Sequence, residues 1–412
     1  MWRQTFTWRP TFTWRQTFTW RQTFRFVDLQ WPLLLFVVVN LGMVAWSGVR
    51  PGGDSGIYLD GAHALLTGQP LTVRQPSYAG YIAFVAFSQA TGTGLIGLIL
   101  GQVAAATAAA YAVYLIARQL GGPLAATVSV VMAAIDFDTN RWHAYILSDS
   151  LYASVLVIGV WLVYRAGLKP QVPSPKPQVP SPKPYVLARV FLVAAGLIRP
   201  EGWFVIPAAA GWWVWRAAST TAGRWIGLAA VAAGCVLLVV VAAPRLSGHA
   251  EAVGPGEMLA RGQTIWEYDG WRRSMPVASP EAGDYGSAGR AIRYALQHPV
   301  HTVALMAARA GVHFAHVRPY FSPSHNALIV MWLLPLYALA IHGWWRVRAH
   351  NLAHWILIVI ATQTLVVALT HADWDGRYLG HVMPLIYPCA ACGLAALLHR
   401  AVPTVHDKLA AL

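Results

Sequence analysis

The stretch GLIGLILGQVAAATAAAYAVYLIA, residues 94–117, carries no charged side chain and decides the fold class of this chain. A helix of about 20 consecutive apolar residues crosses the hydrocarbon core of a bilayer, and this stretch is longer than that. The whole chain is 57% hydrophobic and only 11% charged, whereas soluble domains average about 25% charged residues. The sequence therefore predicts an all-α polytopic membrane protein.

Further apolar runs on both sides of this stretch bring the expected number of membrane spans to about ten. The runs are roughly 31–49, 94–117, 123–136, 148–165, 185–198, 202–216, 224–243, 326–345, 352–371 and 378–398. Two other stretches leave the number between ten and twelve. Residues 78–89 are apolar but short, and residues 301–318 mix apolar with basic side chains, as in a helix lying in the outer interface.

The charged residues favour one orientation. With both termini in the cytoplasm, Arg118, Arg165 and Arg216 lie in short inner connections, as the positive-inside rule requires. The same orientation places every acidic residue except Asp28 and Asp407 on the outer side. We therefore expect an integral protein of a bacterial-type plasma membrane, with its active site at the outer face.

The net charge of +14 does not indicate a nucleic-acid partner, because the basic residues are scattered at loop ends. The expected surroundings are membrane lipids. Cys235, Cys389 and Cys392 lie in apolar runs, so we expect no disulfide framework, and the CAAC motif at 389–392 is interpreted as helix packing.

Two low-complexity segments help to divide the chain. Residues 2–25 repeat the hexamer WRQTFT, whose arginines and aromatic rings would adhere to an anionic cytoplasmic leaflet. The repeat KPQVPSP begins at Lys169 and predicts a polyproline-type spacer. The expected segments are a cytoplasmic tail (1–26), a first membrane module with a catalytic outer loop (27–168), a cytoplasmic linker (169–184), middle membrane helices (185–243), an outer loop with interfacial helices (244–325), C-terminal membrane helices (326–400) and a cytoplasmic tail (401–412).

Carboxylates beside hydrocarbon are costly, so those at the ends of apolar runs are candidates for function. Asp54 follows the turn-forming sequence RPGG, and Asp149 begins the fourth span. A helix N-cap formed by Ser148 or Asp149 is the competing structural explanation. Asp136 and Asp138 rank below Asp149 as functional candidates, because they can be interpreted as solvated turn residues.

Two arginines lie at the same predicted boundary, Arg199 in LIRPEGW and Arg377 in DWDGRY. A guanidinium group grips phosphate with paired hydrogen bonds, as a lipid-phosphate substrate requires. Both side chains could instead reach the lipid headgroups without any catalytic role.

These groups suit the transfer of a sugar from a polyprenyl phosphate to an acceptor. One carboxylate must deprotonate or orient the acceptor, and cations must stabilise the charge that develops on the phosphate. We assign Asp54 as the base, Asp149 as a supporting carboxylate, and Arg199 and Arg377 as phosphate-binding residues. A single displacement of this kind inverts the anomeric centre.

Aromatic and charged residues of the outer segments are candidate substrate contacts. They are Tyr58, Tyr81, Glu201, Trp266, Glu267, Asp269, Trp271, Asp375 and Tyr378. The segment IWEYDGWRR, residues 265–273, suits sugar stacking, but an interfacial aromatic belt explains it equally well.

A metal site is only a weak alternative. His313 and His316 are one helical turn apart and could bind a metal with His371, Asp373 or Asp375, but interfacial histidines without a metal are commoner. No cofactor is assigned. A divalent cation bridging the catalytic aspartate and the donor phosphate remains open.

Five motifs, taken in order, resemble the C-type (GT-C) polytopic glycosyltransferases, which include protein O-mannosyltransferases and lipid A aminoarabinose transferases. The motifs are GDSGIY (53–58), QPSYAGY (75–81), SDSL (148–151), RPEGW (199–203) and DGRYLGHVMP (375–384). The resemblance covers roughly residues 27–168 and 185–400. It implies a GT-C-like fold, a polyprenyl-phosphate sugar donor, an outer active site and a catalytic aspartate in the first loop, which is Asp54 here.

The chain departs from larger members of that family in two ways. We expect no C-terminal soluble domain, and the first loop has one aspartate where protein mannosyltransferases have an acidic pair. The acceptor is therefore left open among lipid, glycan and protein.

Two other classes of function stay open. A polytopic transporter or lipid-linked sugar flippase is expected to show internal repeats and ionisable groups at mid-bilayer. The sequence shows no convincing repeat between its halves, and its charges gather toward one face. A catalytically inactive scaffold is the third reading, because the low-complexity repeats suggest relaxed constraint.

Overall fold

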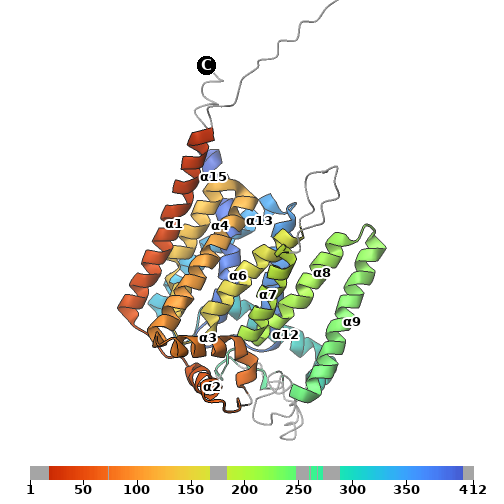
Figure 1. Ribbon diagram of the computed structural model, residues 1–412. Coiled ribbons are helices and arrows are strands. Elements are labelled where there is room, and N and C mark those ends of the chain that lie inside the picture. The colour runs from red at the N-terminus through yellow and green to blue at the C-terminus, as the bar shows by residue number, and fades with distance from the viewer. Residues whose placement is uncertain are drawn as a thin grey trace, which may run out of the picture.

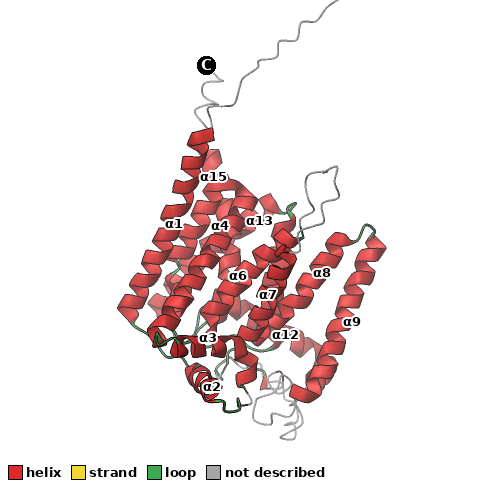
Figure 2. Cartoon of the chain, in the orientation of Figure 1, coloured by secondary structure: helices red, strands yellow, loops and turns green. Residues whose placement is uncertain are grey.

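The computed structural model describes residues 18–72, 74–167, 183–246, 259, 261–266, 268–271 and 288–401. Within these ranges the regular elements are all helices, and the long helices stand side by side as a bundle (Figures 1 and 2). Residues 1–17 of the N-terminal repeat, 168–182 of the linker, 402–412 of the C-terminal tail and much of the expected 244–325 loop lie outside the described residues.

The expected spans all coincide with helices. These are α1 (Phe18–Ser47), α4 (Gly94–Ile135), α6 (Ser148–Ala166), α7 (Lys183–Ile198), α8 (Val205–Ala217), α9 (Thr221–Leu246), α13 (Pro323–Val347), α14 (Asn351–Leu369) and α15 (Met383–Ala401). Among the described residues, five helices (within α1, and α4, α6, α13 and α14) are long and apolar enough to cross a membrane. The prediction of an all-α, integral, multi-pass membrane protein is confirmed.

Helix α4 supplies two of the expected spans, 94–117 and 123–136. Its backbone breaks at Gly122, where φ is 82° and ψ is −169°. The amide of Gln102, in the first half, donates to the carbonyls of His143 and Tyr145, just beyond the second half. The two halves therefore run back alongside each other as a helical hairpin.

Replacing Gly122 with alanine is expected to lower the stability by about 1–3 kcal/mol, because this backbone region is essentially restricted to glycine. The thermal unfolding midpoint of the purified protein in detergent would report the loss. Gly42→Ala in α1 is the matched control, because a methyl group there meets no other atom within 4 Å. An equal midpoint for both variants would contradict this account of the turn.

Short helices gather at one end of the bundle, where α2, α3 and α12 lie across its lower end in Figure 1. They are α2 (Ser55–Thr67), η1 (Gln75–Tyr78), α3 (Ala79–Ala90), α5 (Phe137–Asn140), η2 (Arg141–Ala144), η3 (Pro200–Phe204), α11 (Ala288–Gln297), α12 (Pro299–Ala315) and η4 (Arg377–His381). The two uncertain stretches of the sequence correspond to α3 and α12. Neither is long enough to count among the spans.

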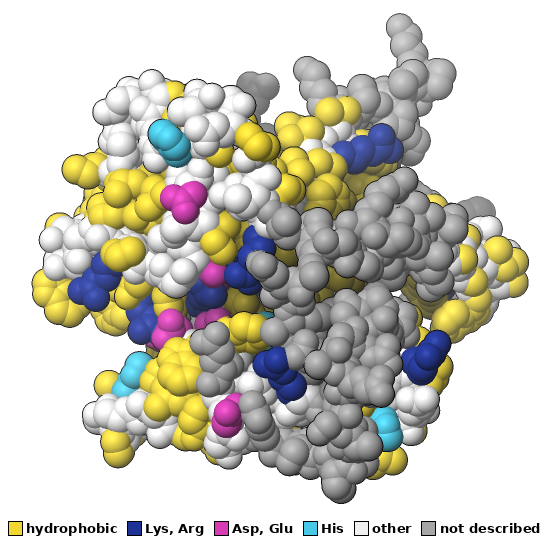
Figure 3. Space-filling model, turned by 90° about the horizontal axis from the view of Figure 1, so that it is seen from below, with side chains coloured by type: hydrophobic (Ala, Val, Ile, Leu, Met, Phe, Trp, Pro, Cys, Tyr) yellow, Lys and Arg dark blue, Asp and Glu magenta, His cyan; other side chains and the backbone are white. Residues whose placement is uncertain are grey.

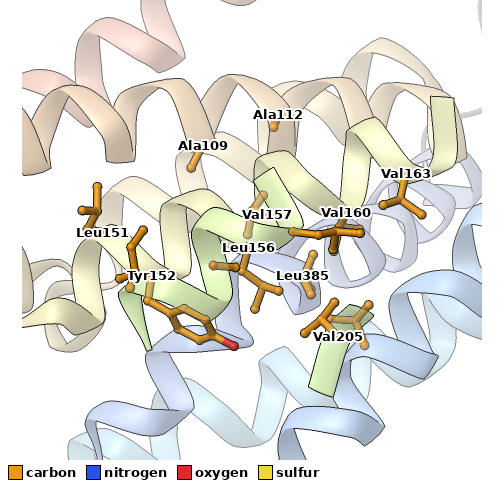
Figure 4. Packing of buried hydrophobic residues seen from close by; sticks show 14 of the residues in the cluster. Ala109, Ala112, Leu151, Tyr152, Leu156, Val157, Val160, Val163, Val205 and Leu385 are labelled. Carbon is orange, nitrogen blue, oxygen red and sulfur yellow. The ribbon is translucent and has the colours of Figure 1, made fainter. Parts of the chain in front are cut away.

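Helix α6 is the centre of the packing that positions this end. Buried residues of α6 pack against α4, α8 and α15 (Figure 4). The labelled contacts are Leu151, Tyr152, Leu156, Val157, Val160 and Val163 of α6 with Ala109, Ala112, Val205 and Leu385. The alanines of α4 allow close approach between helices, which drives association where no aqueous hydrophobic effect operates.

Small residues also join α13 to α15. A methyl group on Gly343 would lie 1.8 Å from the carbonyl oxygen of Cys389, and one on Gly393 would lie 2.1 Å from that of Leu339. Cys389 and Cys392 are free and buried, and a methyl group on Gly121 of α4 would lie 2.6 Å from the sulfur of Cys392. The geometry agrees with the interpretation of the CAAC motif as helix packing.

Candidate active site

Four segments far apart in sequence meet at the lower end of the bundle. They are the loop after α1, the segment that leads into α6, the corner between α7 and η3, and the loop before α15. Together they line most of a cavity of about 650 Å³. Seen from below, dark blue and magenta charged side chains gather in a hollow between hydrophobic surfaces (Figure 3). The charged residues singled out from the sequence as candidates for function lie mainly in these segments.

Arg199 forms the buried centre of the charge network. Its Nη1 donates to Asp149 Oδ1 at 2.8 Å and to Ser148 Oγ at 3.2 Å. Its Nη2 and Nε donate to the two carboxylate oxygens of Glu201, at 2.9 and 3.2 Å. Burial opposes its charge, but Asp149 and Glu201 outweigh that effect and raise the pKa of the guanidinium above its ordinary value. All three guanidinium nitrogens of Arg199 are therefore already engaged by the protein.

The local sequence explains this arrangement. Pro200 cannot continue α7, so Arg199 adopts an extended backbone (φ −147°, ψ 141°) at the corner. The chain then folds tightly back on α7, and a methyl group on Gly202 would lie 2.3 Å from the carbonyl carbon of Ala195. The RPEG sequence thus turns Arg199 and Glu201 toward each other beside Asp149.

Arg377 connects three carboxylates at the cavity wall. Its Nη2 donates to Asp54 Oδ2 at 3.0 Å, and its Nε donates to Asp373 Oδ1 at 3.1 Å. Its Nη1 lies 3.7 Å from Asp149 Oδ2, a distance too long for a hydrogen bond. The carboxylates, chiefly Asp149 and Asp373, outweigh burial and raise the pKa of Arg377. The left-handed Gly376 (φ 75°) makes the turn that brings Asp373 and Arg377 together.

Asp149 lies between the two arginines and is buried, with 2% of its side chain exposed. Besides Arg199, its Oδ1 contacts His381 Nε2 at 3.0 Å. The ring of Tyr378 packs beside both cations, 5.2 Å from Arg199 Cζ and 5.7 Å from Arg377 Cζ. The structure therefore brings Asp54, Asp149, Arg199 and Arg377 into one network.

The other residues singled out from the sequence fall into four groups. Lining the cavity are Glu201, Trp266, Asp375, Tyr378 and His313. Buried beneath it are Tyr58, which bonds Ser148 Oγ at 3.1 Å, and Tyr81, which donates to Gln102 at 2.9 Å. Asp269 and Trp271 are exposed and are not among the residues that line the cavity. Glu267 lies outside the described residues.

The weak metal candidates separate in space. His313 faces the main cavity, whereas His316 lines a second one and pairs with Asp138. Within the described ranges, no group of three or more His, Cys, Asp or Glu side chains is arranged to hold a metal ion. Burial acts to raise the pKa of Asp138, but the hydrogen bond and charge of His316 outweigh it and lower that pKa.

The second cavity, of about 490 Å³, adjoins the first at Trp142. Its walls are mainly apolar residues of α1, α13 and η4, among them Met43, Trp46, Leu328 and Leu333. Polar groups from the α5–η2 segment also line it. Arg141 belongs to this group and donates to the carbonyl of Asp375, a residue of the first cavity, at 3.3 Å.

Two buried arginines hold the loops of the site in place. Arg318 donates to the carbonyl oxygens of Asp373 at 2.9 Å and of Trp374 at 3.2 Å. Arg309 donates to the carbonyl oxygen of Gln263 at 2.8 Å, and burial lowers its pKa to about 10. The sequence shows that both arginines belong to the segment 301–318, but it does not predict that they hydrogen-bond the carbonyl groups of these loops.

No family model matches this chain, and no curated protein matches it. A solved structure titled "Crystal Structure of ArnT from Cupriavidus metallidurans in the apo state" is similar, with 14% sequence identity and a TM-score of 0.43. The similarity covers 92% of this chain and 61% of that one, so this chain spans about three fifths of that structure's length.

Proposed function

We propose that this protein is a membrane glycosyltransferase of the C type. It takes a sugar from a polyprenyl-phosphate donor and transfers it to a lipid, glycan or protein acceptor at the outer face, with inversion. The observation that carries the proposal is the contact between Asp54 and Arg377, 3.0 Å apart at the wall of the main cavity. It places a candidate base beside a candidate phosphate ligand.

Asp54 suits the role of base because it is accessible. Its side chain is 30% exposed, compared with 2% for Asp149. It follows Gly52 and Gly53, which also line the cavity, so the chain there leaves room for an acceptor. A general base must lie within hydrogen-bond reach of the proton it removes, and a residue at the cavity wall meets that condition.

Arg377 suits the donor phosphate better than Arg199. Arg377 has 15% of its side chain exposed at the cavity, whereas Arg199 has 3% exposed and its nitrogens already bond Asp149, Ser148 and Glu201. We therefore revise the assignment from the sequence. Arg199 positions Asp149, and Arg377 carries the phosphate contact.

Phosphate binding and base activation are coupled in this arrangement. A donor phosphate competes with Asp54 for the Nη2 group of Arg377, and its binding frees the Asp54 carboxylate. The acceptor group then gives its proton to Asp54 as its lone pair attacks the anomeric carbon. The bond from that carbon to the phosphate oxygen breaks, and the electron pair leaves with the phosphate, where Arg377 stabilises the charge.

Asp149 supports this geometry without contacting the cavity. Its carboxylate lies between Arg199 and Arg377 and also contacts His381. A buried carboxylate with such partners fixes the position of the neighbouring guanidinium groups. This is a positioning role rather than a catalytic one.

The second cavity suits the apolar part of a lipid substrate. Its mainly hydrophobic walls lie between α1 and α13, and it adjoins the charged cavity at Trp142. We propose that a prenyl or acyl chain lies there while the headgroup reaches the Asp54–Arg377 pair. In the orientation that we propose from the charges, both termini lie in the cytoplasm and these cavities lie at the outer face.

Transfer assays test the proposal directly. The purified full-length protein is reconstituted in lipid nanodiscs with a panel of polyprenyl-phosphate sugars, and the anomeric configuration of the product is determined. Transfer from at least one donor with inversion is expected. A retained configuration would overturn the single displacement. Movement of the lipid-linked sugar across proteoliposomes without transfer would overturn the enzyme assignment in favour of a flippase.

A further inference from the structure

Three buried nitrogen atoms without a hydrogen-bond partner lie on side chains that line the main cavity. They are Nε2 of His313, Nε2 of Gln363 and Nδ1 of His371. A buried polar atom left unsatisfied costs about 1–3 kcal/mol, so native proteins rarely accumulate them without a reason. The charge network of Asp54, Asp149, Arg199 and Arg377 uses none of these three atoms.

One face of α14 forms the centre of this wall. Gln363, Val366 and Val367 of α14 line the cavity together with the C-cap residue Thr370, and the spacing of three and four residues places the first three on one side of the helix. Gln363 is buried, with 4% of the residue exposed. Its carbonyl end accepts from Tyr152 at 3.0 Å, which leaves the NH₂ end of the amide without a partner. If the oxygen and nitrogen of this amide were exchanged, the NH₂ group would bond Tyr152 and the carbonyl oxygen would be left without a partner.

The two histidines add neutral groups to the same wall. His313 comes from α12 and has 3% of the residue exposed, while the ring of His371 packs against Trp266 with a centroid distance of 4.7 Å. Burial lowers the pKa of His313 to about 3 and that of His371 to about 4. Both imidazoles are therefore neutral at pH 7, and each ring nitrogen can accept from or donate to a hydroxyl group.

The chemistry of this wall differs from that of the Asp54–Arg377 pair. Neutral amide and imidazole nitrogens suit hydroxyl groups, and an aromatic ring such as Trp266 suits the apolar face of a sugar ring. A phosphate is better served by the guanidinium of Arg377. The cavity therefore combines a charged site and a neutral polar site within one volume of about 650 Å³.

We propose that His313, Gln363, His371 and Trp266 form the subsite for the sugar ring of the donor, and that this ring is a neutral, polyhydroxylated one. The inference rests on the proposed function and deepens it, because it assigns residues and a chemical class to sugar recognition. The sugar hydroxyls satisfy the unpaired nitrogens, while the phosphate of the same donor lies at Arg377.

Binding to the full-length protein in nanodiscs tests this subsite. The probes are a polyprenyl phosphate, the same lipid carrying a neutral hexose, and the same lipid carrying a uronic acid. The wild type is expected to bind the hexosyl lipid at least 10-fold more tightly than the unglycosylated lipid, and also more tightly than the uronic acid lipid. In Gln363→Leu and in His313→Leu this preference falls to less than 3-fold, while affinity for the unglycosylated lipid is unchanged.

Two matched variants separate recognition from folding. Tyr152→Phe removes the same internal hydrogen bond as Gln363→Leu but keeps the amide at the cavity, so it retains the preference. Thr362→Val, next to Gln363 on α14, removes a hydroxyl that already donates to the carbonyl of Ile358. This variant is also expected to retain the hexose preference. If both subsite variants keep the full hexose preference, the subsite is wrong although the proposed function stands. If the wild type binds none of the three lipids, the proposed function itself fails.

Discussion

Replacing Asp54 with asparagine is expected to lower kcat for sugar transfer by a factor of about 10²–10⁴, the usual contribution of a general base. Asparagine has nearly the same size but cannot accept the proton of the acceptor. The variant should fold normally, because Asp54 has 30% of its side chain exposed and, among the residues that the structure describes, makes one ion pair, with Arg377. Initial rates at saturating donor and the unfolding midpoint are the two measurements.

Asp60→Asn is the matched control, because Asp60 lies on the adjacent helix α2 and is exposed. Its kcat should stay within a factor of two of the wild type. If Asp54→Asn keeps more than a tenth of the wild-type kcat, Asp54 is not the base.

Replacing Arg199 with glutamine is expected to destabilise the fold by about 3–5 kcal/mol, because removing one partner of a buried ion pair leaves an uncompensated charge. The substitution removes the salt bridges from Arg199 to Asp149, at 2.8 Å, and to Glu201, at 2.9 Å. It should lower the unfolding midpoint of the purified protein far more than Arg189→Gln, a control at an exposed position of the same helix α7.

A double-mutant cycle distinguishes the pair from a general packing defect. Asp149→Asn removes the charge that Arg199 balances, so the double variant Arg199→Gln, Asp149→Asn should lose less stability than the sum of the two single variants. Additive losses would show that Arg199 and Asp149 do not act as a pair.

The spans were predictable because a bilayer imposes a simple rule on composition. An apolar run of sufficient length has few alternatives to a membrane helix, and the helical hairpin in α4 follows from the Gly-Gly-Pro sequence at 121–123 between two such runs. The structure also brings Asp54, Asp149, Arg199 and Arg377 together. This was predictable because charged residues at the ends of neighbouring helices lie at the same boundary of the membrane.

Side-chain direction was not predictable in the same way. Tyr58 and Tyr81 lie in motifs beside the site, but both rings point into the helix packing below the cavity. The engagement of Arg199 by Glu201, two residues away, depends on the turn at Pro200, which pattern alone does not fix. His313 and Gln363 belong to helices that the sequence separates from the motifs, so only the tertiary structure places them at the cavity.

The account depends most on competition between Asp54 and the donor phosphate for Arg377. Affinity for a polyprenyl phosphate, measured with wild-type protein, Asp54→Asn and Arg377→Gln in nanodiscs, tests this directly. Removing the competing carboxylate should make Asp54→Asn bind about 10-fold more tightly than the wild type, equivalent to about 1.4 kcal/mol, although its kcat is much lower. Arg377→Gln should bind more weakly. Equal or weaker binding by Asp54→Asn would contradict the claim that the two anions share one guanidinium group.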